Sequence, residues 1–117
     1  MPHPRMYDED DPVLAEVRTV CLALPEAAEV EAWGRPTFRA GAKGRIFVVY
    51  GAEGLIVKPD PAERDALLAD ERFSVPPYFG PSGWLALDLR KPDWTEVAEL
   101  VETSYRQVAL KRQVKEL

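Results

Sequence analysis

Residues 38–58, which read FRAGAKGRIFVVYGAEGLIVK, decide the fold. Their apolar side chains recur with the two-residue period of a strand that buries one face: Ile46, Val48, Tyr50, Leu55 and Val57. Two segments bounded by glycines, Gly41–Gly44 and Gly51–Gly54, separate these runs, because glycine supplies the positive φ that tight turns often require. The stretch therefore predicts strands that follow one another through short turns in an antiparallel sheet.

The chain on either side of this stretch supplies more strands and three helices. The alternation of apolar residues continues over residues 29–40 and residues 84–89. Apolar residues at helical spacing, preceded by an aspartate suited to cap a helix, predict helices from Asp11 to Leu24, from Asp60 to about Ala69, and from Asp93 onward. Helices therefore stand at both ends of a run of strands.

This order of elements predicts a single α+β domain. Strands that are adjacent in sequence favour an antiparallel sheet. We expect two layers, in which a sheet of about five strands packs against the N- and C-terminal helices. Residues 1–11 are assigned to a flexible acidic leader and residues 12–117 to the domain, since a chain of 117 residues suits one core. Phe73–Gly83, with its prolines and glycines, is expected to be an ordered connection.

The residues that common catalytic sites require are missing or out of place. His3 is the only histidine and lies in the expected leader, so a serine or cysteine nucleophile would have no positioned base. Neither glycine-rich turn is followed by the Lys-Ser/Thr pair of a P-loop. The acidic run Asp8–Asp11 is more typical of a solvated helix start than of a rigid metal site. We therefore expect no enzymatic activity, no cofactor and no metal.

Three residues on the helices are expected to be structural. Cys21 has apolar neighbours at helical spacing, which is typical of a buried thiol. Ser104 and Tyr105 fall within the apolar stripe of the last helix; the serine hydroxyl would bond to the preceding turn of its own helix, and the tyrosine would pack its ring. A lone cysteine and the lack of a membrane-length apolar run fit a cytoplasmic protein with no membrane contact.

Positive charge gathers in two segments of a chain whose formal net charge is -5. Residues 1–34 (two bases, eight acids) and residues 59–104 (four bases, ten acids) each sum to -6. Residues 35–58 (five bases, one acid) sum to +4 and residues 105–117 (four bases, one acid) sum to +3. Because the Debye length at physiological salt is about 8 Å, a local basic patch can act largely independently of distant acids. The acidic balance therefore does not exclude a polyanionic partner.

Strand alternation groups some of these bases on one face. Arg35, Thr37 and Arg39 share one side of their strand, and Arg45 and Phe47 are expected to share one side of the next. Such a face combines positive charge with an aromatic ring, as nucleic-acid-binding sheets do. The alternative is that these bases only solvate the sheet and discourage pairing with strands of other chains.

Several short segments, taken together, identify a family resemblance. They are, in chain order, Cys21–Pro25, Trp33–Gly34, Phe38–Arg39, Lys43–Phe47, Leu55–Lys58, Pro77–Gly80, Gly83–Leu85 and Ser104–Tyr105. Their order and spacing, from about Val13 to Lys111, resemble those of the MmcQ/YjbR-like proteins. These are small α+β domains that are often described as predicted DNA-binding proteins.

The resemblance implies a non-enzymatic protein that binds DNA weakly through its basic strand region. The bases of the two positive segments would contact phosphate: Arg35, Arg39, Lys43, Arg45, Lys58, Lys111 and Arg112. They would position the DNA backbone and would not read bases, because no recognition-helix pattern is present.

Two features of the aromatic segments qualify this expectation. In related chains a histidine or basic residue often precedes the second tryptophan, whereas Phe79, Pro81 and Ser82 occupy that connection here. Trp33 and Trp84 either extend the basic face or anchor turns at the margin of the core. The connection before Trp84 therefore lacks the positive charge that related chains carry there.

The fold of this family is similar to those of type III secretion chaperones and frataxin-like (CyaY-like) domains, which leaves two alternatives. A small acidic chain also fits a secretion-chaperone-like module, monomeric or weakly dimeric, that binds a protein partner through an apolar patch near Pro76–Trp84. A frataxin-like iron site would use Glu16, Glu29 and Glu31, although dispersed acids usually face water.

Overall fold

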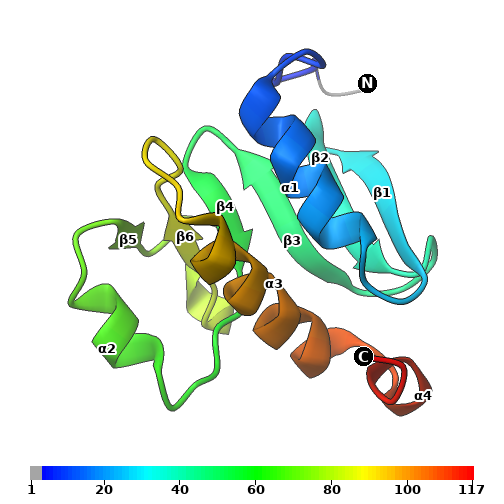
Figure 1. Cartoon of the computed structure of the whole chain (residues 1–117). Helices are drawn as coiled ribbons and strands as arrows, with labels where there is room; N and C mark the ends of the chain where they lie inside the picture. The colour runs from blue at the N-terminus through cyan, green and yellow to red at the C-terminus, as the bar shows by residue number, and fades with distance from the viewer. Residues whose placement is uncertain (1–3) are drawn as a thin grey trace.

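Six strands form one antiparallel sheet in the computed structural model, which describes residues 4–117. Across the sheet the order is β1 (Ala27–Ala32), β2 (Arg35–Ala40), β3 (Ile46–Gly51), β4 (Gly54–Val57), β6 (Leu85–Leu87) and β5 (Phe73–Ser74) (Figure 1). The helices are α1 (Pro12–Leu22), α2 (Arg64–Leu68), the 3-10 helix η1 (Gly80–Ser82), α3 (Trp94–Val108) and α4 (Lys111–Val114). The predicted α+β class is confirmed, and the sixth strand, β5, lies in the segment expected to be a connection.

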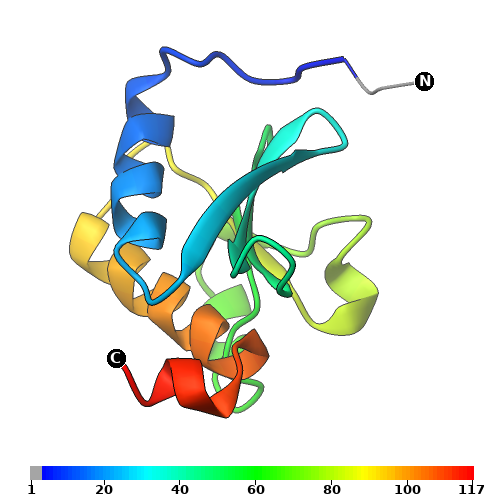
Figure 2. The same cartoon turned by 90° about the vertical axis from the view of Figure 1, so that its right-hand side faces the viewer.

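The two faces of the sheet are covered differently. Figure 2 shows α1 and α3 on one face, here called the helix side, and the segment around η1 on the opposite face, here called the outer face. The helix-side core is the larger one, and its residues include Phe38, Phe47 and Tyr105. A smaller cluster lies on the outer face: Val49, Ile56, Trp84 and Ala86. The central strands therefore bury side chains on both faces.

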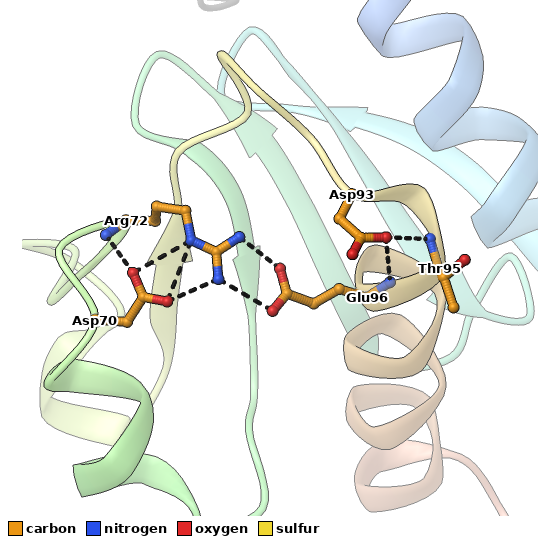
Figure 3. Close-up of polar contacts among 5 residues, drawn as sticks. All are labelled: Asp70, Arg72, Asp93, Thr95 and Glu96. Atoms are coloured by element: carbon orange, nitrogen blue, oxygen red, sulfur yellow. Dashed lines mark hydrogen bonds and ion pairs between the residues drawn. The ribbon is translucent and has the colours of Figure 1, made fainter.

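Side-chain caps begin the two long helices, as the sequence predicts. The Asp11 carboxylate accepts a hydrogen bond from the Val13 N–H at 2.9 Å. The Asp93 carboxylate accepts from the N–H groups of Thr95 and Glu96 at 3.0 and 3.3 Å (Figure 3). Each cap satisfies backbone donors that have no partner within the helix.

Two helix boundaries differ from the prediction. α2 begins at Arg64, because the Asp60 carboxylate accepts from the Ala62 N–H at 2.9 Å and closes a turn ahead of the helix. The C-terminal helix is also shorter than expected, since extended backbone follows α3 and separates it from α4. Lys111 and Arg112 therefore lie on α4 and not on the long last helix.

A β-bulge in β3 places Phe47 on the helix side. The pairing of β2 with β3 shifts by one residue between Phe38 and Arg39, which leaves Phe47 as the extra residue. Phe47 and Val48 consequently both join the helix-side core, and Phe47 is 0% exposed. The expectation that Phe47 adds an aromatic ring to the face that carries Arg39 is wrong, because Phe47 is buried on the helix side whereas Arg39 lies opposite Ile46, which packs against the outer-face cluster.

α3 is fastened to the sheet by Ser104, which is fully buried. Its Oγ donates to the Phe47 carbonyl at 2.6 Å and accepts from the Lys58 N–H at 2.9 Å. This hydroxyl bridges the two strands just beyond the β3–β4 pair Val48 and Val57. The expectation that it bonds within its own helix is wrong, since these two sheet groups need a partner where the ladder ends.

The other two residues expected to be structural are buried as predicted. The Tyr105 hydroxyl donates to the Pro25 carbonyl at 2.6 Å. Cys21 is 0% exposed, and burial raises the pKa of its thiol, which stays protonated. Neither side chain is available as a reactive group.

Part of the segment that precedes α1 lies against the turn between β1 and β2. The Met6 N–H donates to the Gly34 carbonyl at 2.8 Å, and the Tyr7 hydroxyl donates to the Glu31 carboxylate at 2.6 Å. His3 and the other residues of 1–3 lie outside the described residues. Within residues 4–117, no helix has the length and apolar character needed to cross a membrane.

Candidate nucleic-acid interface

Strand pairing brings four of the predicted bases to one end of the sheet. Arg39 lies opposite Ile46, and Arg45 immediately precedes that residue. Lys43 lies in the turn that joins β2 to β3. Lys58 directly follows β4, which runs antiparallel to β3 and ends near its start. These four bases come from separate parts of the strand region and meet at the end where β2 stops.

α4 lies against the same end of the sheet. The Gln113 side chain is buried and donates to the Ala40 carbonyl at 3.2 Å, directly before the β2–β3 turn. This contact places α4, with exposed Lys111 and Arg112, beside the turn. Six of the seven predicted bases therefore share one end of the molecule.

Carboxylates neutralise two of the seven bases and leave five without an ion-pair partner. Arg35 Nη1 lies 2.9 Å from Glu53 Oε1, and Arg112 is paired with Glu26. Among residues 4–117 the other five have no carboxylate oxygen within 4.0 Å, and we call them the basic end: Arg39, Lys43, Arg45, Lys58 and Lys111. Arg39 Nε is also buried without a hydrogen-bond partner in this part of the chain, so its donor capacity is not fully used.

Arg35 is separated from the basic end, although it shares a strand with Arg39. It lies at the opposite end of β2, where Gly51 leaves space for its pair with Glu53. A Cβ atom at Gly51 would approach Arg35 Nη1 to 2.6 Å and Glu53 Oε1 to 3.0 Å. The structure therefore does not bring Arg35 together with the other predicted bases.

The acidic residues of β1 lie on the helix side of the sheet. Ala27 packs against the helix-side core, and alternation places Glu29 and Glu31 on the same side. Glu29 accepts two hydrogen bonds from Arg18 of α1, at 2.7 and 2.9 Å. The outer face of β1 carries only small or apolar side chains: Ala28, Val30 and Ala32. Positive charge on the outer face of β2 is therefore not opposed by the neighbouring strand.

Four aromatic rings form a cluster on the outer face beside a hollow. Trp33, in the β1–β2 turn, has its ring centroid 6.4 Å from that of Tyr78 and 6.2 Å from that of Phe79, which lies 5.6 Å from Trp84. Trp33 and Tyr78 are 44% and 81% exposed, whereas Trp84 is buried. The hollow has a volume of about 400 Å³, and we call it the aromatic hollow. Its lining also includes Met6, Val49, Pro77 and the Arg35–Glu53 pair.

A larger hollow, of about 580 Å³, lies beside the β3–β4 turn but is lined by groups that satisfy one another. Arg72 donates to Asp70 and to Glu96 at 2.7 Å each (Figure 3). The bonds to Asp70 and then Glu96 raise the pKa of Arg72. Asp88 is held by Arg90 at 2.6 Å. This network ties the segment before β5 to α3, and we consider it structural.

Other groups with shifted pKa values, and two of the acids considered for an iron site, also form hydrogen bonds within the protein. The Tyr50 hydroxyl donates to the Asp11 carboxylate, which lowers the pKa of Asp11, while burial raises the pKa of Tyr50. Of the acids considered for an iron site, Glu29 holds Arg18 and Glu31 accepts from Tyr7. Residues 4–117 contain no group of three or more histidine, cysteine or acidic side chains placed to hold a metal ion.

The sequence did not reveal the partners that neutralise Arg35 and Arg112. Glu53 and Glu26 are far from them along the chain, and no motif marks such a pair. The sequence predicts an apolar patch near Pro76–Trp84, which contains Tyr78, but does not single out this ring as the most exposed aromatic side chain of that segment.

Comparison with known proteins agrees with this fold. The model of the YjbR family matches residues 22–107, and no curated protein matches the chain. The crystal structure of Deinococcus radiodurans protein DR2400, described as a DUF419 domain, is similar with a TM-score of 0.73 and 21% sequence identity, covering 88% of this chain and 86% of that chain. The structural similarity establishes a common fold. Because the family model spans most of the sequence, the chain belongs to the YjbR family.

Proposed function

We propose that this protein is a non-enzymatic, cytoplasmic binding protein that holds the phosphate backbone of DNA weakly through the basic end. The observation that supports the proposal is the gathering, at one end of the sheet, of five bases that have no ion-pair partner within residues 4–117. An unpaired cation keeps its attraction for phosphate, whereas Arg35 and Arg112 would first have to leave their carboxylates.

The number of unpaired bases limits the salt dependence of binding. If all five neutralised phosphates of a duplex, the slope of log K against log salt would be about -4.5 at most, since each contact contributes about -0.9. Proteins that make 6–10 such contacts show steeper slopes. Binding through phosphate alone also carries no direct sequence information. We therefore expect weak, salt-sensitive binding without strong sequence preference.

Charge reversal at the basic end tests this function. Fluorescence anisotropy of a labelled duplex would be measured from low to physiological salt with the wild-type protein and with a triple variant, Arg39→Glu, Lys43→Glu and Arg45→Glu. The variant should lose most of its affinity at low salt, because three attractions become repulsions. Circular dichroism would confirm that the variant is folded.

A second triple variant controls for net charge. It carries the same change in charge at bases away from the basic end: Arg5→Glu, Arg90→Glu and Lys91→Glu. This variant should bind nearly as well as the wild type. Absence of binding at low salt, or equal losses in both variants, would contradict a localised DNA-binding surface.

The aromatic hollow favours a second candidate function, a protein-interaction module. Trp33 and Tyr78 are exposed, and Met6 and Val75 beside them are 56% and 50% exposed, so the outer face carries an apolar patch. Sedimentation velocity over a concentration series would test whether this patch joins two copies. A monomer at all concentrations would argue against self-association as the role of the patch.

A further inference from the structure

We propose that the nucleic acid held by the basic end is single-stranded and that its bases stack on Trp33 and Tyr78 in the aromatic hollow. This inference rests on the proposed function and specifies its ligand. It assigns a role to the exposed rings of Trp33 and Tyr78 on the outer face, which phosphate contacts at the basic end leave unused. Aromatic side chains next to a basic surface are the combination by which proteins hold unpaired bases irrespective of sequence.

The geometry of the two rings suits stacking. Tyr78 is 81% exposed and Trp33 is 44% exposed, so both present ring surface to a ligand. Their planes are tilted by 47°, and each ring is supported by Phe79, at 5.4 and 6.2 Å between centroids. Phe79 in turn packs against buried Trp84. The exposed rings are therefore backed by the outer-face cluster, which lowers the entropic cost of stacking a base on them.

The aromatic hollow and the basic end are joined by one strand. β2 begins two residues after Trp33 and continues to Arg39, so the distance along the chain is about 20 Å at 3.3 Å per residue. Arg39 faces outward together with Thr37, because Phe38 and Ala40 belong to the helix-side core. The two sites therefore lie on the same side of β2, with Thr37 buried between Arg35 and Arg39.

The charges of this face favour a polyanion over a peptide. Glu53 is the acidic residue in the hollow and is already paired with Arg35, while the acids of β1 lie on the helix side. The unpaired charges next along the face are positive: Arg39 on β2 and Lys58 after β4. An extended chain of phosphates that leaves the hollow along β2 would thus meet cations.

A duplex cannot use the hollow in the same way. Paired bases are stacked on both faces within the helix, so they are unavailable to Trp33 and Tyr78, whereas the bases of a single strand can be turned out onto aromatic rings. The hollow is lined by Trp33 of the β1–β2 turn, by Pro77, Tyr78 and Phe79, and by Val49. We therefore expect single-stranded DNA to bind more tightly than duplex DNA of equal length.

The test compares oligothymidine of about 15 nucleotides with a duplex of the same length, by anisotropy at one low salt concentration. Tyr78→Ala should weaken binding of oligothymidine by about fivefold or more and change duplex binding by less than about twofold. Tyr78→Phe keeps the ring and should retain binding. Because Tyr78 is highly exposed, its removal should leave the fold intact, and Leu22→Ala, an exposed apolar residue on the helix side, serves as the matched control.

Tryptophan fluorescence gives an independent readout. Stacking of thymine on Trp33 should quench part of the emission, and Trp33→Phe should remove that quenching while keeping a ring in the hollow. Trp84 and Trp94 are buried or partly buried and should contribute an unchanged signal.

The outcomes separate failure of this inference from failure of the proposed function. The single-strand inference is overturned if oligothymidine and duplex bind equally and Tyr78→Ala binds like the wild type. The proposed function still stands in that case, provided that reversal of Arg39, Lys43 and Arg45 abolishes binding. If neither ligand binds at low salt, or the reversals have no effect, both are overturned. Tyr78-dependent self-association without binding to oligothymidine would assign the hollow to a protein contact and overturn the inference.

Discussion

Ser104→Ala tests how the long C-terminal helix is joined to the sheet. The substitution removes a single oxygen atom that serves the Phe47 carbonyl at 2.6 Å and the Lys58 N–H at 2.9 Å. Ser104 is 0% exposed, so we expect both backbone groups to be left without a partner and without access to water. The variant thus converts one lost hydroxyl into two buried, unsatisfied groups.

The magnitude follows from these two groups. A buried donor or acceptor left unsatisfied costs about 1–3 kcal/mol, and alanine returns about 0.5 kcal/mol through its higher helix propensity. Taking the lower half of that range for each group and subtracting the gain in helix propensity, the free energy of unfolding should fall by about 1.5–3.5 kcal/mol. A domain of this size has a total stability of about 5–15 kcal/mol, so the variant should still fold at room temperature.

Urea denaturation followed by circular dichroism measures this loss. The midpoint should fall while the dependence of unfolding free energy on urea stays the same, because the folded state keeps its compactness. Thr103→Ala, on the same helix, is the matched control: it makes the same kind of change in helix propensity, and its hydroxyl makes no hydrogen bond to residues 4–117. If the two variants differ by less than about 0.5 kcal/mol, the Ser104 bridge does not carry the energy that we assign to it.

Two further changes have defined outcomes. Tyr50→Phe removes the hydrogen bond that lowers the pKa of Asp11, and should reduce the free energy of unfolding by about 1.5 kcal/mol at neutral pH. A lowered carboxylate pKa stabilises the fold above the ordinary value near 4, so this loss should shrink as the pH falls through the lowered pKa. A difference in urea midpoint between variant and wild type that is the same at neutral and acidic pH would contradict this role of the pair. Gly54→Ala should cost more than about 2 kcal/mol, since φ is +107° and the new Cβ would lie 2.0 Å from the Leu87 carbonyl oxygen. Gly83→Ala separates backbone strain from this clash, because φ is +91° there and, apart from the two chain neighbours, no heavy atom of residues 4–117 lies within 4 Å of the new Cβ. Similar melting temperatures for the two variants would contradict the clash.

Local pattern was sufficient for the class of fold and for the starts of its long helices. Alternation between polar and apolar residues identified β1 to β4 and β6, and Asp11 and Asp93 marked the helix starts because capping acts between residues two or three apart. β5 was missed because two residues are too few to show a period. The position of α2 was missed because a turn at Asp60 and a helix cap use the same residue type.

The candidate site depended on contacts that are remote in sequence. Alternation correctly placed Arg35 and Arg39 on one face, but only the fold reveals that Glu53 pairs with the first and leaves the second unpaired. The bulge at Phe47 arises from the pairing of two strands, so it has no signature in either strand alone. α4 lies at the basic end because Gln113 bonds to the Ala40 carbonyl, and no pattern in the sequence predicts this contact.

The Ser104 hydroxyl also makes one amide proton a reporter of tertiary docking. In an ordinary sheet a strand N–H is protected by its neighbouring strand, but the N–H of Lys58 is protected by a side chain of α3. Deuterium should therefore enter this position whenever the helix lifts from the sheet, even while β3 and β4 stay paired. Its exchange rate, compared with that of the Val57 amide one residue earlier, would report the free energy of helix detachment separately from that of global unfolding.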